Sequence, residues 1–559
     1  MYTDVMTEIA RFKAGRIHVA RAGLATQARL CVDMLQQGRG MAWVVKNRDE
    51  LLTARALMRL FSPELSSGDF LPDALDKGGW TSLPPFSPRL ANREGWTERL
   101  SALYALRSGQ AKGLILTADN LLPKLVPLDF FENREVTLIR GEDVSLDMIL
   151  EQAVEWGYER VSMVSNPGEI ARRGDILDIM PPGYDKPIRL DFFGDLIEEI
   201  RLFDPVSQRS KANLSEVRVL PVSPIRQSPA DQAKMQARWK SLFQKNMLTE
   251  NERFGLTRLQ EQGDFRLLPG CCYDTATNLE AWLPADTVWV LPGLSDFRDM
   301  LSSAERLWTE AFEVQDVEGR PQPQRLAMRE ASDVESACER FACVHAEPLV
   351  MGIAKGIHDL PERSLSSFED LFPSTAEQDR PWQTLVQALK RWQNDKRQTI
   401  LCFASEKSRT KFLNLASQDG LSPLLRYSGE QHGLFALVAP FRAGAELIWD
   451  QSLILGEDLL QPHAEKSRRV PTGAFKGLDR YDELKPGDLL VHRDYGIARF
   501  GGLLRMETGS TANDFLLLHY SGDDRLYVPV DRLSLIQRFK GGGEAQPSLD
   551  RLGGGAWQS

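Results

Sequence analysis

The sequence has few cysteines and no long apolar run. Six cysteines are scattered over 559 residues without zinc-site spacing, so we expect reduced, mostly buried thiols of a cytosolic protein. No apolar stretch approaches the roughly 20 residues that span a bilayer. The first residues carry acids and lack the apolar centre of a signal peptide. These absences predict a cytoplasmic protein with no membrane partner.

Motifs of common enzyme sites are also missing. A phosphate-binding loop needs glycines before a lysine and a serine or threonine, whereas the corresponding position reads RAGLATQARL (21–30). The seven histidines include no pair four residues apart with a glutamate between them, and no serine or cysteine lies in a nucleophile-elbow motif. We therefore expect no catalytic residue, no bound cofactor and no metal.

The charge of the chain is acidic overall. A net charge of −10 argues against a surface that binds nucleic acid throughout, although a local basic face remains compatible with it. Aspartates and glutamates concentrate between residues 175 and 199, and paired carboxylates can hold a metal ion for hydrolysis. These acids alternate with arginines, so a salt-bridged strand surface is the stronger interpretation.

Periodicity predicts an α/β multidomain protein. A buried strand, MAWVV (41–45), is followed by an amphipathic helix, DELLTARALMRLF (49–61). The same order of strand and then helix is expected within 113–125. This alternation favours a parallel sheet. Residues 136–220 change to a helix with Ser145 as N-cap and a β-meander broken at glycine and proline. The α/β pattern then resumes, which permits an inserted α+β module.

The remaining sequence predicts two smaller domains. Residues 399–416 form a strand–helix unit of a second small α/β domain, and residues 463–477 read as a basic linker. About five short strands then fit a C-terminal SH3-like or Tudor-like β-barrel. The Gly-rich C-terminal residues do not complete a further helix or strand, so we expect the chain to be truncated there. The predicted boundaries are 1–135, 136–220, 221–345, 346–460, 461–480, 481–545 and 546–559.

Two adjacent phenylalanines in IRLDFF (188–193) must point to opposite faces of a strand. Ile188 and Phe192 share one face, which we predict to be the core side. Arg189 and Phe193 share the other, where exposed arginine and aromatic side chains are the types that anchor interfaces.

A second crowded strand is GGLLRMETG (501–509). Leu504, Arg505 and Met506 lie on a barrel too small to bury every apolar side chain. One apolar side chain should therefore face out, and methionine is common on adaptable contact surfaces.

At these residues the sequence resembles a known family. The run RGDILDIM…IRLDFFGD (173–195) resembles the module shared by UvrB and the transcription-repair coupling factors (the Mfd family). The run GDLLVHRDYGIARFGGLL (487–504) resembles the CarD-like RNA-polymerase-interacting domain of the same family, and GGGAW (553–557) stands where the linker to its motor begins. The two together point to this family, and the likeness covers essentially the whole chain.

The resemblance implies partners and site residues. UvrA binding falls on Arg173, Arg189 and Phe193. Contact with the RNA polymerase β subunit falls on Met506, where some members have leucine, with Leu504 and Arg505 as neighbours. The family also implies a monomer in which a C-terminal domain masks the UvrA-binding face, so we expect this chain to bind UvrA constitutively.

Departures from UvrB limit what carries over. UvrB has a Walker A loop and a tyrosine-rich DNA-inspecting hairpin, whereas this chain reads TSLPPFSPRLANREGW (81–96). Residues 1–135 and 221–345 therefore resemble a degenerate UvrB-like domain without ATPase or damage verification. In the family, ATP, magnesium and DNA are bound by a translocase motor that is absent here, and residues 346–460 receive no role. The alternatives are a CarD-like regulator acting through the barrel alone, or a UvrB-like ATPase or metal nuclease.

Overall fold

The structure is a computed structural model that divides into two compact units, Met1–Pro462 and His463–Ser559, each described by itself. The predicted linker at 461–480 and the terminal segment at 546–559 lie outside the residues that the structure describes. Those residues are 2–11, 14–61, 79–87, 90–205, 209–347, 357–373, 380–427, 432–460, 487–492, 496–508, 511–521, 525–529 and 536–538.

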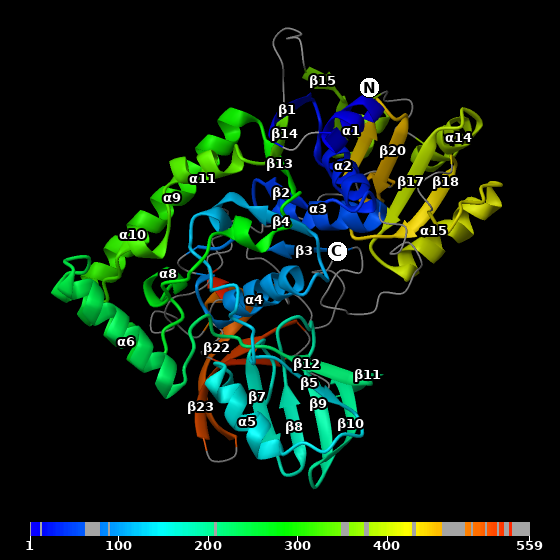
Figure 1. Ribbon diagram of the computed structural model, residues 1–559. Helices are drawn as coiled ribbons and strands as arrows, with labels where there is room; N and C mark the ends of the chain where they lie inside the picture. The colour runs from blue at the N-terminus through cyan, green and yellow to red at the C-terminus, as the bar shows by residue number, and fades with distance from the viewer. Residues whose placement is uncertain are drawn as a thin grey trace. The chain divides into compact units, whose positions relative to one another are not determined.

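A seven-stranded sheet organises the first unit (Figure 1). The strand order is β15-β1-β14-β13-β2-β4-β3, and every pairing is parallel, as the periodicity predicts. Its strands are β1 (Gly15–Ala20), β2 (Met41–Val45), β3 (Trp80–Leu83), β4 (Gly113–Thr117), β13 (Val288–Pro292), β14 (Ala342–Glu347) and β15 (Ile357–Asp359). Alternate residues of β2 enter two separate cores, Val44 in one and Trp43 in the other, as expected for a strand buried on both faces.

Helices flank this sheet, and the expected helix at 49–61 is confirmed as α3. The expected helix within 113–125 is wrong, because β4 leads only into a 3-10 turn. Pro123 cannot continue a helix, and the Asn120 amide donates to the Pro84 carbonyl and the Thr117 hydroxyl at 3.0 Å each, which favours a turn. The helices are α1 (Tyr2–Arg11), α2 (Leu24–Gln36), α3 (Arg48–Phe61), α4 (Arg93–Arg107) and η2 (Ala118–Leu121).

A second sheet forms from residues between β4 and β13, so the chain leaves the parallel sheet and returns to it. Its order β11-β10-β9-β8-β7-β6 follows the sequence in reverse, and all pairs but β6–β7 are antiparallel, as predicted for a meander. Its elements, with the β5–β12 pair and helix α5, are β5 (Val136–Ile139), α5 (Leu146–Glu155), β6 (Glu159–Arg160), β7 (Glu169–Arg173), β8 (Ile176–Ile179), β9 (Ile188–Phe193), β10 (Leu196–Phe203), β11 (Ser210–Leu214) and β12 (Glu216–Val219).

Helix α5 covers the apolar face of this second sheet (Figure 1). Leu146, Ile149 and Leu150 of the helix share one core with the inward residues of the strands. Ser145 is the N-cap residue as predicted, but its side chain makes no capping hydrogen bond. The opposite face of the sheet carries the charged residues discussed below.

A helical region precedes and follows β13. Its elements are α6 (Pro229–Gln244), α7 (Glu250–Glu261), α8 (Pro269–Cys272), η3 (Leu279–Trp282), α9 (Leu294–Val317), α10 (Gln324–Ala327) and α11 (Ala331–Cys338). Proline at the start of α6 and the capping box of Thr249 and Glu252 at α7 explain where these helices begin.

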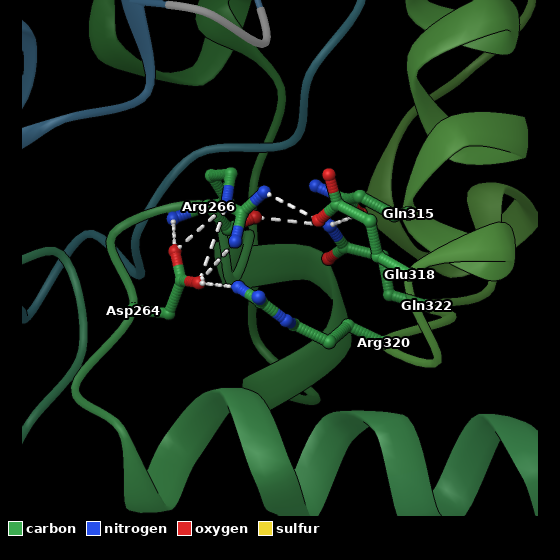
Figure 2. A network of polar contacts seen from close by, with 6 residues as sticks. All are labelled: Asp264, Arg266, Gln315, Glu318, Arg320 and Gln322. Carbon is green, nitrogen blue, oxygen red and sulfur yellow. Dashed lines mark hydrogen bonds and ion pairs between the residues drawn. The ribbon is translucent and has the colours of Figure 1, made fainter. Parts of the chain in front are cut away.

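A polar network ties the end of α9 to the loop after α7 (Figure 2). Arg266 donates to Asp264 from Nη2 at 2.7 Å and to Glu318 from Nη1 at 3.1 Å. The Gln322 amide donates to the Arg266 carbonyl at 2.9 Å and to Gln315 Oε1 at 2.8 Å. Burial opposes the charged form of Asp264, but the hydrogen bonds from Arg266 outweigh it and hold the pKa of that carboxyl below its usual range.

The rest of the first unit is a five-stranded sheet of order β16-β19-β20-β17-β18. Its elements are β16 (Glu362–Leu365), α12 (Phe368–Leu371), α14 (Pro381–Asn394), β17 (Gln398–Phe403), α15 (Glu406–Gln418), β18 (Leu434–Val438), β19 (Gly444–Leu447), β20 (Ser452–Gly456) and η4 (Glu457–Leu459). The predicted strand–helix unit is confirmed as β17 and α15. Ile400 and Phe435 of this sheet share a core with Val19 of the parallel sheet, so the two sheets form one packed body.

The second unit is an antiparallel sheet of order β24-β23-β22-β21-β25. Its strands are β21 (Leu489–His492), β22 (Gly496–Thr508), β23 (Thr511–His519), β24 (Arg525–Pro529) and β25 (Ile536–Arg538). Five strands are expected and found, but not all are short, because β22 runs for 13 residues through a bulge between Phe500 and Gly502. Among the described strands no pairing joins β24 to β25, so barrel closure stays a prediction.

All six cysteines are buried and free of disulfides, which confirms the predicted buried thiols. Burial raises the pKa of Cys271 to about 12, so this thiol stays protonated near neutral pH. Within the described ranges, no helix has the length and apolar character needed to cross a membrane.

Candidate protein-docking site

Strand β9 divides its side chains between the core and water, as the alternation predicts. Ile188 and Leu190 are fully buried, and Phe192 retains only 5% exposure in the core beneath α5. Phe193 is 74% exposed. The predicted assignment of the two phenylalanines is confirmed, and an aromatic ring in water is the type of residue that anchors interfaces.

Arg189 lies on the same face as Phe193 but is held by its own domain. Its Nε donates to Asp178 Oδ1 at 2.7 Å and its Nη2 to Oδ2 at 2.8 Å, and its guanidinium stands 4.5 Å from the centre of the Phe203 ring. The hydrogen bonds to Asp178 raise the pKa of Arg189 further. The side chain keeps 18% exposure. Arg189 is therefore less exposed than alternation alone suggests, because an aspartate stands directly opposite it on β8.

Arg173 and Phe193 occupy equivalent positions in neighbouring hairpins. Each immediately precedes a Gly-Asp turn that joins two paired strands, and Gly174 and Gly194 have φ of +63° and +64°, a conformation in which glycine carries no steric penalty. Arg173 pairs with Ile176, and Ile176 pairs with Asp191 of β9. Arg173 and Phe193 thus lie on one face at one end of the sheet.

The Arg173 side chain is exposed. Its Nη2 donates to the Ser162 carbonyl at 2.7 Å and its Nε to the same oxygen at 3.2 Å. The next residue, Met163, is 47% exposed. The three residues predicted for UvrA binding are brought onto one face. Asp178, one of the acids expected to form a salt-bridged strand surface, pairs with Arg189, whereas Met163 was missed by sequence reasoning.

Three of the carboxylates that could have held a metal ion instead pair with arginines. Asp178 pairs with Arg189, and Asp191 and Glu199 both pair with Arg201 of β10. Across the part of the chain that the structure describes, no three His, Cys, Asp or Glu residues are grouped as metal ligands. The arrangement is the salt-bridged strand surface that the sequence favours.

The N-terminus of α2, where a phosphate-binding loop would cradle an anion, already holds a carboxylate. Glu362 of β16 accepts from the Thr26 amide at 2.7 Å and from the Ala25 amide at 3.2 Å. A Cβ added at Gly23 would come within 2.4 Å of Glu362 Oε1, so the carboxylate fills the space beside the loop. Burial raises the pKa of Glu362, although the two amides oppose that effect. The helix amides that would bind a phosphate in a phosphate-binding loop are therefore already bonded to a carboxylate of the chain itself.

The residues predicted to contact RNA polymerase lie in the outer half of β22. Leu504, Arg505 and Met506 pair with Phe515, Asp514 and Asn513 of β23, respectively. Their side chains lie outside what the structure describes.

Comparison with known proteins identifies two segments of the chain. Residues 136–224 match the family described as the UvrB interaction domain, and residues 484–540 match the CarD-like/TRCF RID domain. A transcription-repair-coupling factor from Myxococcus xanthus is 30% identical over 512 residues, covering 83% of this chain and 40% of the relative. This chain is related to the transcription-repair-coupling factors.

Other transcription-repair-coupling factors give the same picture. The Escherichia coli protein is 28% identical and covers 86% of this chain, and the Haemophilus influenzae protein is 28% identical and covers 90%. The resemblance predicted from the sequence is confirmed. The chain spans 40% to 44% of the length of these relatives.

Proposed function

We propose that this chain acts in transcription-coupled repair by recruiting UvrA through residues 136–224 and binding the RNA polymerase β subunit through residues 484–540. The observation that carries the proposal is Phe193, which is 74% exposed within the segment that matches the UvrB interaction domain. An aromatic ring of this size left in water by a folded domain is a candidate for burial in a partner.

The charged residues around Phe193 favour a partner surface with carboxylates beside an apolar pocket. Arg173 is exposed and donates to the Ser162 carbonyl, and Arg189 is held by two hydrogen bonds to Asp178. A side chain fixed before binding loses less conformational entropy when the complex forms. In this proposal Phe193 and Arg173 contact UvrA directly, and the Arg189–Asp178 pair keeps the strand face in its binding geometry.

The polymerase contact is proposed for Met506, with Leu504 and Arg505 beside it. It is supported by the match of residues 484–540 to the CarD-like/TRCF RID domain and by the long β22–β23 hairpin on which these residues lie. Such a hairpin can offer the backbone of an exposed strand edge to a partner strand.

We further propose that this chain hydrolyses no ATP and needs no cofactor to bind either partner. ATP, magnesium and DNA would be engaged by a motor of the kind found in the family. The carboxylate of Glu362 at the N-terminus of α2 supports this proposal, because it competes with a phosphate for the same amides. ATPase and nuclease assays of the chain without partners test it, and turnover in either assay would contradict it.

Binding of purified UvrA to the Phe193→Ala variant tests the recruitment step. We expect a loss of about 1–3 kcal/mol in binding free energy, measured by biolayer interferometry with the wild-type chain as reference. Phe254→Ala is the matched control, because Phe254 is 65% exposed in α7, outside the matched segment, and should leave UvrA binding unchanged. Equal loss in both variants, or no binding by the wild-type chain, would overturn the proposal.

Binding of RNA polymerase to the Met506→Arg variant tests the second contact. We expect weaker polymerase binding and unchanged UvrA binding, since a charge would enter an apolar contact. Loss of both partners together would indicate misfolding, which circular dichroism would detect. A chain lacking residues 1–460 that keeps every effect of the whole chain on transcription and repair would favour the CarD-like alternative.

A further inference from the structure

A cavity of about 620 Å³ in the helical region of the first unit has four cations among its eight lining residues. Lys124, Arg325, Arg329 and Arg340 line it against a single carboxylate, Asp333. The whole chain carries a net charge of −10, so this concentration of positive charge runs against its overall composition. Focused charge of one sign in a hollow favours ligands of the opposite sign.

Arg329 forms a fixed cationic floor for this cavity. Its residue exposure is only 9%, its Nε donates to the Leu121 carbonyl at 2.9 Å, and its Nη2 lies 2.7 Å from Glu280 Oε1. Burial of a guanidinium is costly unless partners hold it, and here two partners fix its orientation. The floor is therefore in place before any ligand arrives.

Lys124 and Arg340 differ from the other two cations because no described residue pairs with their side chains. Arg325 donates to both oxygens of Glu252, at 2.6 and 2.9 Å. Among the described residues, the side chains of Lys124 and Arg340 form no ion pair or hydrogen bond, although both line the cavity. Their charge is available to a ligand.

The backbone around Lys124 is held from both sides. Isolated bridges join Pro123 to Met328 and Leu125 to Thr277, and the Lys124 amide donates to the Ala327 carbonyl at 3.0 Å. The backbone of residues 123–125 is therefore held by hydrogen bonds to two other segments of the chain, one at Ala327 and Met328 and the other at Thr277. A site built on such a segment has little ordering cost on binding.

We propose that this cavity binds phosphate groups, carried either by a small phosphorylated compound or by a nucleic acid chain. Lysine and arginine in this number bind phosphate through charge-assisted hydrogen bonds, and the volume lies within the range of small-ligand pockets. The residues that line the cavity belong neither to β9 nor to β22, and the proposal does not depend on UvrA or polymerase binding.

Calorimetric titration of the whole chain with sodium pyrophosphate at constant ionic strength tests the proposal. We expect single-site binding that the double variant Lys124→Glu/Arg340→Glu weakens about 10- to 100-fold. Arg107→Glu is the control for a charge reversal outside the cavity, because Arg107 is exposed in the last turn of α4 and does not line the cavity. Absence of pyrophosphate binding, or equal weakening by the control, would overturn the proposal.

Two further probes separate the sources of the phosphate. A single-stranded DNA oligonucleotide should bind with a salt dependence that the double variant reduces if nucleic acid is the ligand. Pyrophosphate binding without oligonucleotide binding supports a small phosphorylated compound instead. A glutamate-rich peptide that binds the cavity more tightly than both phosphate probes would contradict phosphate as the ligand class. Unchanged thermal unfolding of the double variant confirms that it is folded.

Discussion

The N-terminus of α2 and the outer face of β9 each fix a charged side chain, but only the second leaves an apolar ring in water. At α2, the Glu362 carboxylate, which comes from β16, accepts hydrogen bonds from the Ala25 and Thr26 amides in the first turn of the helix. At β9, Arg189 binds Asp178 within one module, while Phe193 remains 74% exposed.

The difference lies in where the partner of each charge comes from. Glu362 reaches Thr26 from 336 residues away along the chain, and the Trp449 indole adds a hydrogen bond to the Thr26 hydroxyl at 3.0 Å. The polar groups at the start of α2 therefore find their hydrogen-bond partners within the chain itself. On the β9 face, Arg189 has its partner within the same module, whereas the Phe193 ring stays 74% exposed. A rigid face with one exposed ring suits recognition, whereas a filled helix terminus suits stability.

The largest effect is expected when the two adjacent phenylalanines are truncated one at a time. Phe192→Ala should lower the free energy of unfolding by about 3–5 kcal/mol, because a buried ring leaves a cavity. Phe193→Ala should change it by no more than about 0.5 kcal/mol. Urea denaturation followed by circular dichroism measures both. Similar losses in the two variants would contradict the assignment of core and outer faces.

The next effect concerns the charge that holds the β9 face. Arg189→Ala should cost about 3 kcal/mol of stability, since it leaves the buried Asp178 carboxylate uncompensated. Arg173→Ala should be nearly neutral, because Arg173 is exposed and its bonds to described residues go to a backbone carbonyl. The same denaturation assay separates them. A neutral Arg189→Ala variant would show that the ion pair does not hold the strand face.

A smaller loss is expected when the carboxylate at α2 is removed. Glu362→Ala should cost about 1–3 kcal/mol, because the Ala25 and Thr26 amides lose their acceptor. Glu362→Gln keeps an acceptor oxygen and should cost less. Chemical denaturation monitored by tryptophan fluorescence tests this order, and a larger loss for Gln than for Ala would break it.

The smallest effects are in the pH dependence of stability, where two carboxyls should act in opposite directions. The folded-state pKa of Asp264 lies below its usual 3.8, so its contribution is present above that pH and lost as pH falls through the folded value. The folded-state pKa of Glu362 lies above its usual 4.5, so stability declines as pH rises from there through the folded value.

Replacing each carboxyl by the corresponding amide removes its titration, and so tests these two dependences of unfolding free energy on pH. Asp264→Asn should flatten the acid limb of a plot of unfolding free energy against pH, and Glu362→Gln should flatten the decline at higher pH. Guanidinium denaturation between about pH 3 and 7 covers both groups near their usual values. Parallel slopes in both variants and the wild-type chain would contradict the assignments.

Local sequence determined the faces and most elements of this protein. The alternation in IRLDFF set Phe192 inward and Phe193 outward, and the pairs of strand and helix at β2–α3 and β17–α15 followed from periodicity. These features depend on where each side chain points along one element. That direction is fixed by backbone geometry over a few residues.

Only the tertiary structure decided which distant groups meet. β13 and β14 return to the parallel sheet after the module between β4 and β13, Asp178 limits the exposure of Arg189, and Glu362 reaches the start of α2. Each of these contacts joins segments that no local pattern relates. They form because burying apolar faces of several elements together brings the chain back on itself, and only then do the buried charges find partners.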